Sequence, residues 1–328
     1  MADVLLLGAG FSRNWGGLLA NEVFEHLLAI PDIHQDSYLR ELLWQYSNRG
    51  GFEDALTEVQ AEYSRQPDRI GPSLQALQNG ITSIFEAMND AFFARDTMEF
   101  SSDVDRQIKR FFVRFDAIFT LNQDILLEHH YLPHIAQAGS DRWTGPQIMG
   151  VRRTNRTQGG PESWAKETWV PADVNDIRIS ERLQPLYKLH GSSNWRDAEG
   201  GQLFVVGGNK SRTIESQTAL SWCFEQFVRE ISEGSARLLV IGYSFRDDHI
   251  NHEIIKAVTI HGLRFFVIDP NGADVVRYAN PSHEGVAYGP KDLDEAFKVG
   301  LVGASRRTLS ETFDHDTVSH ENVTRFLD

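Results

Sequence analysis

Five short apolar runs, spread along the chain, are each followed at once by a glycine-rich or polar motif. Runs of this length and composition indicate strands that are buried on both faces of a sheet. Helix-like segments alternate with several of the runs, for example at residues 220–231 and 247–258. Alternating strands and helices predict a parallel sheet. The five predicted strands are residues 4–7, 116–120, 185–189, 237–241 and 264–268.

A long helical stretch separates the first two predicted strands. From residue 37 to about residue 110, apolar side chains recur at helical spacing, as at Phe52, Leu56 and Val59, and the Pro72-Ser73 pair predicts a helix start. We therefore predict an α/β fold: a Rossmann-like parallel sheet with helices on both faces and a helical insertion after the first βα unit. The predicted Rossmann-like domain comprises residues 1–36 and 111–328, and the predicted insertion comprises residues 37–110.

Two segments have weak periodicity. Residues 139–183 are polar and rich in Gly, Pro, Trp and Arg, and a stretch of this length is either a functional loop or a surface for a partner. The sequence leaves these two interpretations open. About thirty residues at the C-terminal end are also weakly patterned.

Net charge limits the classes of partner. The formal charge is −14, and binding to nucleic acid requires neutralisation of phosphates, so we expect no direct contact with nucleic acid. The best local exception is Arg152, Arg153 and Arg156, although short basic stretches in loops are usually only solvated.

The apolar runs and the cysteine content indicate the compartment. The runs are too short to cross a bilayer, and no basic region precedes Val4, so we expect no membrane segment and no signal peptide. Cys223 is the single cysteine, which excludes an intrachain disulfide and a cysteine zinc cluster. We therefore expect a cytoplasmic protein without a zinc ribbon and without a bound metal.

The five motifs are expected to meet in one place. In open parallel sheets, ligands bind at the carboxyl ends of the strands, near the point where the strand order reverses. The motifs that follow the five strands should therefore converge on one crevice, and this convergence is stronger evidence than any single motif.

The first motif is the turn after residues 4–7. Glycines at such a turn let backbone N–H groups approach a pyrophosphate, although a tight strand–helix turn would need them as well. Arg13 stands where the dehydrogenase fingerprint has its third glycine, and no second strand with an acidic end follows at the usual distance, which disfavours hydride transfer. The motif consists of Gly8, Ala9, Gly10, Phe11 and Ser12.

The next two motifs supply polar side chains. Asn122 and Asp124 could hydrogen-bond ribose hydroxyls and a water, or one of them could cap the following helix. His190 could act as a general base, because imidazole titrates near neutrality, and Gly191 would leave room for a sugar. A single histidine at a strand end is nevertheless more often structural.

The last two motifs follow residues 237–241 and 264–268. Gly242 and Ser244 form a turn that could bind phosphate or ribose oxygens, and Phe245 follows them. Asp269 and Asn271 could hold a ribose or an adenine edge. Ordinary turn chemistry explains each pair equally well.

Taken in order, the five motifs resemble those of the sirtuin superfamily, and more closely those of the bacterial sirtuin-like domains of anti-phage defence systems. Two departures concern the deacylases of that superfamily. Sirtuin deacylases usually carry a four-cysteine zinc ribbon, and they follow the first motif with Ile-Pro-Asp-Phe-Arg, where residues 17–21 here are Gly-Leu-Leu-Ala-Asn. The resemblance therefore supports an NAD site more strongly than protein deacylation.

The defence-associated relatives imply a function. They hydrolyse NAD, as substrate, to nicotinamide and ADP-ribose, which implies an NAD glycohydrolase that acts as the toxic effector of abortive infection. By resemblance, Asn122 and His190 are the catalytic pair, and Asp124 stabilises charge or holds the loop. The implied NAD-binding residues are Gly8, Ala9, Gly10, Phe11, Ser12, Gly242, Ser244, Phe245, Asp269 and Asn271.

The resemblance also implies partners, and two alternative functions stay open. Relatives of this class occur with a HerA-type ATPase, with an Argonaute or fused to sensor domains, so we expect a homo-oligomer and a separate regulating subunit such as a HerA-type ATPase.

The alternatives to an NAD glycohydrolase are a zinc-free NAD-dependent protein deacylase and a non-enzymatic sensor of NAD or ADP-ribose.

Overall fold

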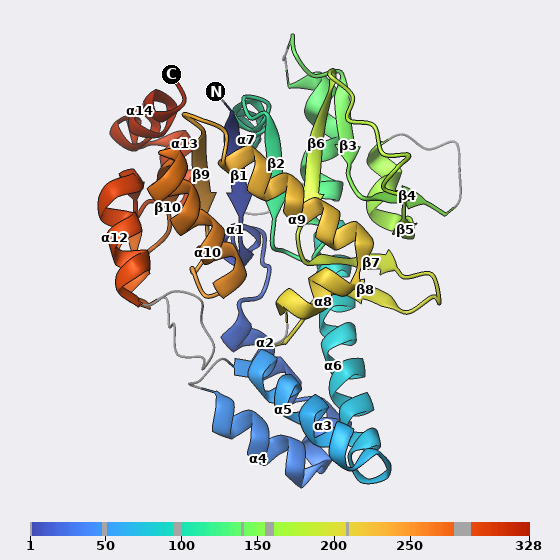
Figure 1. The fold of residues 1–328 in the computed structure, drawn as a ribbon. Coiled ribbons are helices and arrows are strands. Elements are labelled where there is room, and N and C mark those ends of the chain that lie inside the picture. The colour runs from blue at the N-terminus through green and yellow to red at the C-terminus, as the bar shows by residue number, and fades with distance from the viewer. Residues whose placement is uncertain are drawn as a thin grey trace.

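A parallel sheet forms the centre of the molecule (Figure 1). The computed structural model describes residues 2–47, 51–94, 100–138, 141–154, 161–207, 210–278 and 290–328. Within these ranges, seven parallel strands lie in the order β11-β10-β9-β1-β2-β6-β3. The strands are β1 (Asp3–Leu7), β2 (Ala117–Thr120), β3 (Gly145–Ile148), β6 (Leu183–Lys188), β9 (Arg237–Ile241), β10 (Arg264–Ile268) and β11 (Leu301–Ser305).

The strand order reverses beside β1. The chain passes from β1 to β2 and on to β6 on one side, and then returns to β9, β10 and β11 on the other side. Leu7 is in register with Thr120 of β2 and Ile241 of β9, so these carboxyl ends are level. This is the place where open parallel sheets bind ligands. All five strands predicted from the sequence are confirmed, and so is the predicted fold class.

Helices cover both faces of the sheet, as predicted. Side chains alternate along β1, so Val4 and Leu6 join one hydrophobic core, whereas Leu5 and Leu7 join the other. The first core is closed by α9 (Thr218–Ile231), α10 (Asp248–Lys256), η4 (Ala257–His261) and α12 (Pro290–Gly300). The second is closed by α7 (Ser102–Phe112), η1 (Leu127–Tyr131), η2 (Leu132–Gln137), α13 (Leu309–Asp314) and α14 (Thr317–Phe326).

A group of helices lies beyond the carboxyl ends of the strands, at the bottom of Figure 1. The predicted apolar positions Phe52, Leu56 and Val59 are buried there. We call this set the helical group. It consists of α2 (Ala20–Leu28), α3 (Pro31–Gln35), α4 (Ser37–Tyr46), α5 (Gly51–Arg65) and α6 (Pro67–Phe93), which pack on one another. The boundaries of the predicted insertion stay predictions: α2 and α3 pack with the helical group, and α7 packs against α13.

The predicted helix start at Pro72 is wrong. Helix α6 begins five residues earlier, with Pro67 in its first turn, and Pro72 lies inside it. A proline at the first position of a helix loses no hydrogen bond, because the N–H there has no partner within the helix. An interior proline lacks an N–H that the helix would use, and here the packing of α6 maintains the helix through Pro72.

The two weakly patterned segments contain short strands. Residues 139–183 supply the edge strand β3 and two strands of a second sheet, whose order is β4-β5-β7-β8. The C-terminal end supplies β11, the opposite edge of the main sheet. The second sheet consists of β4 (Val151–Arg153), β5 (Trp169–Pro171), β7 (Gly191–Arg196) and β8 (Gln202–Phe204).

The remaining elements are short: α1 (Ala9–Arg13), η3 (Pro161–Lys166), α8 (Lys210–Ser216), η5 (Gly272–Asp274) and α11 (Val275–Tyr278). Across the described residues, no helix combines the length and the apolar character that a bilayer span requires.

Candidate functional site

The first and fourth motifs meet backbone to backbone where β1 and β9 end. A Cβ atom on Gly8 would lie 2.6 Å from the carbonyl oxygen of Gly242, and one on Gly10 would lie 2.8 Å from the Cα of Gly242. The N–H groups of Gly8 and Gly10 donate to the carbonyls of Ile241 and Gly242 at 3.0 and 2.9 Å. These glycines are thus required by the contact between two strand ends, and their part in binding a pyrophosphate stays a prediction.

Gly242 gives a direct test of this contact. Its φ is +62°, and a Cβ atom there would lie 2.5 Å from the carbonyl carbon of Gly10. Gly242→Ala should therefore lower the free energy of unfolding by about 1–3 kcal/mol, from the left-handed backbone and the clash together. Urea unfolding of the variant measures this loss, with Gly234→Ala as control, because a Cβ atom at Gly234 meets nothing within 4 Å. Equal stability of the two variants would contradict the assignment.

The first motif also bonds to the second. The amide of Asn122 donates to the carbonyl of Gly8 at 3.0 Å and to Ser12 Oγ at 2.9 Å. Ser12 Oγ in turn donates to Asp124 Oδ2 at 2.7 Å, and Asp124 Oδ1 accepts from the N–H of Leu126 at 3.0 Å. All three side chains are buried. The structure therefore brings Ser12, Asn122 and Asp124 into one hydrogen-bonded network beside β1.

A buried ion pair holds the loop that carries Asn122. Lys188 Nζ, at the end of β6, lies 2.8 Å from Glu128 Oε1 and 2.5 Å from the carbonyl oxygen of Asp124. Each of the two charged side chains is 1% exposed. Burial raises the pKa of Glu128, and Lys188 opposes this effect. The ammonium group therefore fixes the main chain of the second motif to the strand that leads to His190.

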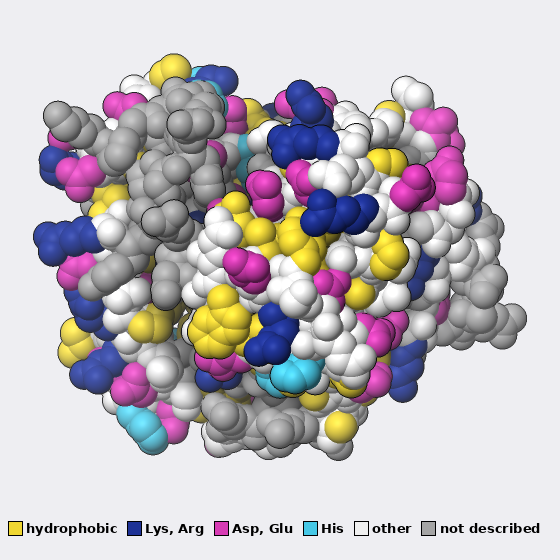
Figure 2. Space-filling model, turned by 90° about the horizontal axis from the view of Figure 1, so that it is seen from below, with side chains coloured by type: hydrophobic (Ala, Val, Ile, Leu, Met, Phe, Trp, Pro, Cys, Tyr) yellow, Lys and Arg dark blue, Asp and Glu magenta, His cyan; other side chains and the backbone are white. Residues whose placement is uncertain are grey.

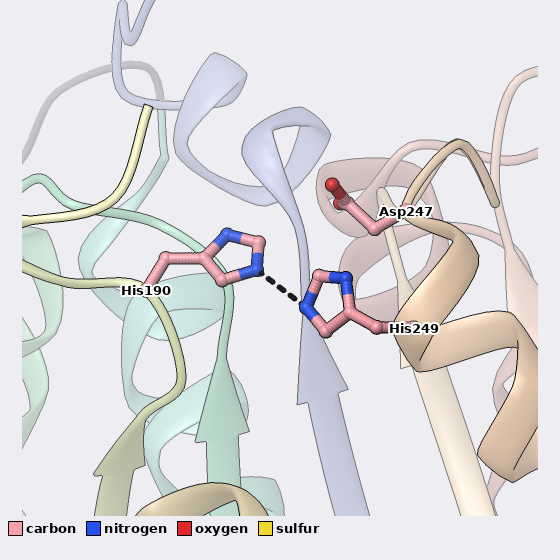
Figure 3. Close-up of side chains that lie close together, drawn as sticks. All are labelled: His190, Asp247 and His249. Atoms are coloured by element: carbon pink, nitrogen blue, oxygen red, sulfur yellow. Dashed lines mark hydrogen bonds between the residues drawn. The ribbon is translucent and has the colours of Figure 1, made fainter. Parts of the chain in front are cut away.

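His190 faces a second histidine. Its Nε2 lies 3.1 Å from Nε2 of His249, which stands in the first turn of α10 (Figure 3). Burial lowers the pKa of His190 to about 3 and the pKa of His249 to about 4. Both imidazoles are therefore neutral near pH 7, and one nitrogen of the contact must donate while the other accepts.

A partly buried ion group lies next to this pair and reaches the helical group. Lys210 Nζ, in α8, is 2.6 Å from Asp247 Oδ1 and 2.8 Å from Glu53 Oε2 of α5. Burial disfavours the charge on Asp247, but Lys210 outweighs this effect and the pKa of the carboxyl falls well below its usual range. The pKa of Lys210 is raised by the two carboxylates despite burial. The helical group is thereby tied to the edge of the site.

Asp247 occupies the N-cap position of α10. Its side chain makes no capping hydrogen bond and pairs with Lys210 instead. The charge-assisted hydrogen bond to the partly buried ammonium of Lys210 is stronger than a neutral cap, so the carboxylate of Asp247 points to Lys210 rather than to the helix end.

His190, Asp247 and His249 also have the ligand types of a metal site. Their nitrogen and oxygen atoms lie within 4.8 Å of one another. However, the two Nε2 atoms are hydrogen-bonded to each other, and the carboxylate of Asp247 is paired with Lys210. A metal ion here would lie beside an ammonium group and would have to break both contacts. In the arrangement described here, the three side chains are engaged with one another and with Lys210.

The other predicted NAD-binding residues follow the neighbouring strands β1, β9 and β10 and differ in exposure. Phe11 and Phe245 are each 1% exposed and pack in aromatic clusters of the two cores, away from solvent. Ala9 and Ser244 are exposed. Asp269 and Asn271 follow β10, where Asp269 Oδ1 accepts from the N–H of Asn271 at 2.7 Å, as in an ordinary turn.

The room expected at Gly191 is filled by protein. Gly191 has φ +72°, and a Cβ atom on it would lie 2.9 Å from the Cα of Phe204 in β8. The glycine at this position permits the close approach of β8, so the space beside His190 is not reserved for a sugar on this side.

Sequence reasoning missed four charged or titratable residues at the site. Asp247 and His249 follow Gly242 closely, and their spacing after a predicted strand end was the available signal. Lys210 and Glu53 come from distant segments without motifs, so nothing in the sequence pointed to them.

A hollow of about 530 Å³ lies elsewhere, next to the edge strand β3. It is lined by the chain after β3 and the chain after β5, with Arg152, Arg178, Asp173 and Asp176 among its side chains. Neither Asn122 nor His190 lines it, so it is separate from the site described above.

Comparison with models of known protein families assigns the chain to a family. The model described as the SIR2-like domain matches residues 116–284, slightly more than half of the 328 residues. The chain belongs to the SIR2-like domain family. The match includes Asn122, Asp124, His190 and the motif that begins at Gly242, and it confirms the resemblance to sirtuins. A search of curated proteins finds no match.

Membership in the SIR2-like family supports a ligand class. SIR2-like domains bind NAD, so the family is consistent with an NAD-utilising enzyme. The groups at the strand ends fit this ligand chemically, because amide, hydroxyl and imidazole side chains are suited to ribose hydroxyls and to water.

Proposed function

We propose that this SIR2-like protein is an NAD glycohydrolase, which cleaves the nicotinamide–ribose bond and releases nicotinamide and ADP-ribose. One observation carries the proposal: Asn122 and His190 are buried at the carboxyl ends of the adjacent strands β2 and β6, beside the reversal of strand order. The paired register of Thr120 with Lys188 places both residues two positions beyond the same level of the sheet.

The reaction needs a base and an oriented water. The bond between ribose C1′ and the nicotinamide nitrogen breaks, nicotinamide leaves as a neutral molecule, and a water oxygen bonds to C1′. The proton of that water, or of a ribose hydroxyl, passes to a base. Neutral His190 has a lone pair for this proton. The amide hydrogens of Asn122 are bonded to Gly8 and Ser12, so Asn122 would orient the water or a ribose hydroxyl through its Oδ1, as an acceptor.

Asp124 has a supporting position. Its two oxygens accept from Ser12 Oγ and from the N–H of Leu126. Because both carboxylate oxygens already accept hydrogen bonds, Asp124 is better placed to hold the loop of Asn122 than to stabilise the ribosyl centre directly.

The variant Asn122→Ala tests the proposed role of Asn122 in orienting water and ribose. Since loss of orientation costs roughly 100-fold in comparable cases, we expect kcat for NAD hydrolysis to fall by about that factor. The exposed residue Asn79 of α6 supplies the matched control Asn79→Ala, which should keep the parent rate. Retention of full activity in Asn122→Ala would remove this residue from the mechanism.

The function itself is tested with the full chain, NAD and no peptide, by chromatography of nicotinamide, ADP-ribose and cyclic ADP-ribose. Equal release of nicotinamide and ADP-ribose supports the proposal. NAD loss that requires an acylated peptide would indicate a deacylase, and NAD binding without turnover, with and without candidate partner subunits, would indicate a sensor.

We further propose a cytoplasmic role as the toxic effector of an anti-phage system, controlled by assembly or by a separate subunit such as a HerA-type ATPase. Uncontrolled NAD loss would harm the host, which motivates a trigger. The helical group offers one contact surface: Figure 2 views it from below and shows hydrophobic side chains among charged ones. Its α4 carries Trp44, which is 59% exposed. Size-exclusion and co-purification data that show a fully active lone monomer would contradict this proposal.

A further inference from the structure

We propose that Asn89, near the C-terminal end of α6, is a positioning residue for the catalytic pair: its amide group joins the loop of Asn122 to the strand that follows His190. This inference rests on the proposed function, in which Asn122 and His190 act on one water. Asn89 lies outside the five motifs that follow the predicted strands.

Asn89 makes one hydrogen bond to each of the two segments. Its Oδ1 accepts from the N–H of Ile125 at 3.3 Å, and its Nδ2 donates to Ser193 Oγ at 2.8 Å. Ile125 is three residues after Asn122, and both belong to the loop that follows β2. Ser193 is three residues after His190, in β7. We call these two hydrogen bonds the Asn89 bridge.

The partners fix the orientation of the amide group. A backbone N–H can only donate, so the oxygen of Asn89 must face Ile125. The nitrogen of the same amide then faces the hydroxyl of Ser193, which can accept. The Asn89 bridge therefore uses both functional atoms of the side chain, one for each segment.

The two segments also bond to each other directly. The N–H of Ser193 donates to the carbonyl of Gln123 at 2.8 Å, and Ser192 Oγ donates to the same carbonyl at 3.3 Å. The Asn89 bridge attaches the loop two residues further along and from another element. The loop of Asn122 is thus held by both β7 and α6.

The helix that carries Asn89 is itself anchored beside the second sheet. Figure 1 shows α6 running from the helical group toward β7 and β8. Thr82 Oγ1 donates to Gln202 Oε1 of β8 at 2.9 Å. The ring centroid of Phe85 lies 5.6 Å from that of Phe204, also in β8. Thr82, Phe85 and Asn89 recur at helical spacing and so share one face of α6, and a side chain on such a packed helix holds a site more precisely than one on a loop.

Helix preference does not explain an asparagine at this position. Asparagine is a poorer helix former than alanine or leucine, because its amide competes for backbone hydrogen bonds. Asn89 lies inside α6, and its amide bonds to two segments outside that helix. A residue that departs from the local preference in this way is expected where function requires it.

The bridge affects the reaction because two groups must reach one water. Asn122 orients the water and His190 takes its proton, so both must lie within about 2.6–3.2 Å of the same oxygen. A misplacement of about 1 Å that originates away from the reacting atoms can cost roughly 100-fold in rate. By joining the two segments, Asn89 holds this spacing and acts through the catalytic pair.

Kinetics of variants at residue 89 test the role. Asn89→Leu keeps a similar volume but removes both hydrogen bonds, so kcat should fall by about 10- to 100-fold, with KM within roughly threefold of the parent. Asn89→Asp keeps the acceptor for the N–H of Ile125, and the hydroxyl of Ser193 can rotate to donate, so this variant should recover most of the lost rate. The control Asn79→Leu changes an exposed residue of the same helix and should keep the parent rate. A parent-like kcat in Asn89→Leu, or an aspartate variant as slow as the leucine variant, would overturn the inference.

Hydrogen–deuterium exchange tests the bridge independently of turnover. In Asn89→Leu we expect faster exchange in residues 122–126 and 190–194, with the rest of the protein and the melting temperature close to the parent, and Asn79→Leu should match the parent throughout. Unchanged exchange in the two segments would overturn the inference. Faster exchange across the whole protein would do so as well, because it would show a general structural role. A parent protein without NAD turnover but with the expected exchange pattern would defeat the proposed function and leave the Asn89 bridge standing.

Discussion

Replacing His190 with alanine should lower kcat for NAD hydrolysis by about 10²–10⁴-fold, the usual worth of general-base help. His190 is buried, and its neutral ring is paired with His249 rather than with a charged group. Alanine removes the proton acceptor and leaves the oriented amide of Asn122 in place. The measurement is release of nicotinamide and ADP-ribose, with the melting temperature recorded on the same sample.

A second substitution separates chemistry from packing. His190→Gln keeps most of the side-chain volume and a hydrogen-bonding atom near His249, but glutamine cannot accept a proton at neutral pH. It should be as inactive as His190→Ala while melting close to the parent protein. Full activity in either variant would remove His190 from the mechanism.

Lys188→Met should destabilise the protein by about 3–5 kcal/mol, as expected when one partner of a buried ion pair is removed. Glu128 would remain in the interior without its ammonium partner, and the carbonyl of Asp124 would lose its donor. Because the loop of Asn122 is held by this contact, activity should fall as well. Urea denaturation curves give the change in the free energy of unfolding.

The double variant Lys188→Met/Glu128→Leu is the matched control. Replacing both members of a buried pair with apolar side chains of similar size is often neutral, because no uncompensated charge remains. The double variant should therefore recover most of the stability that Lys188→Met loses. A single variant within about 1 kcal/mol of the parent would show that Lys188 and Glu128 are not a buried pair in solution.

The sequence was sufficient to predict the sheet because its central strands are encoded locally. Residues 4–7, 237–241 and 264–268 are nearly all apolar. In a run this short, such a composition indicates a strand that is buried on both faces of a sheet. The edge strands β3 and β11 were missed for the opposite reason. They contain glycine, and β3 also contains proline, so the apolar pattern that marks a buried strand is absent there.

Some of the predicted site residues could be placed from the sequence, and others could not. Asn122 and His190 could be placed from sequence because each follows a central strand, and parallel strands bring their carboxyl ends together. Phe11 and Phe245 could not be placed, since a residue in a turn can direct its side chain toward a ligand or into the core. Their burial in aromatic clusters depends on helices far away in the sequence.

By itself, the sequence determined the α/β class, the central strands and the two polar side chains that their ends carry, because periodicity and strand ends are local properties. Only the tertiary structure decided that His190 meets His249, and that Lys210 joins Asp247 to Glu53 of the helical group. Burial and ion pairing depend on segments that lie far apart along the chain, and no local pattern encodes which of them meet.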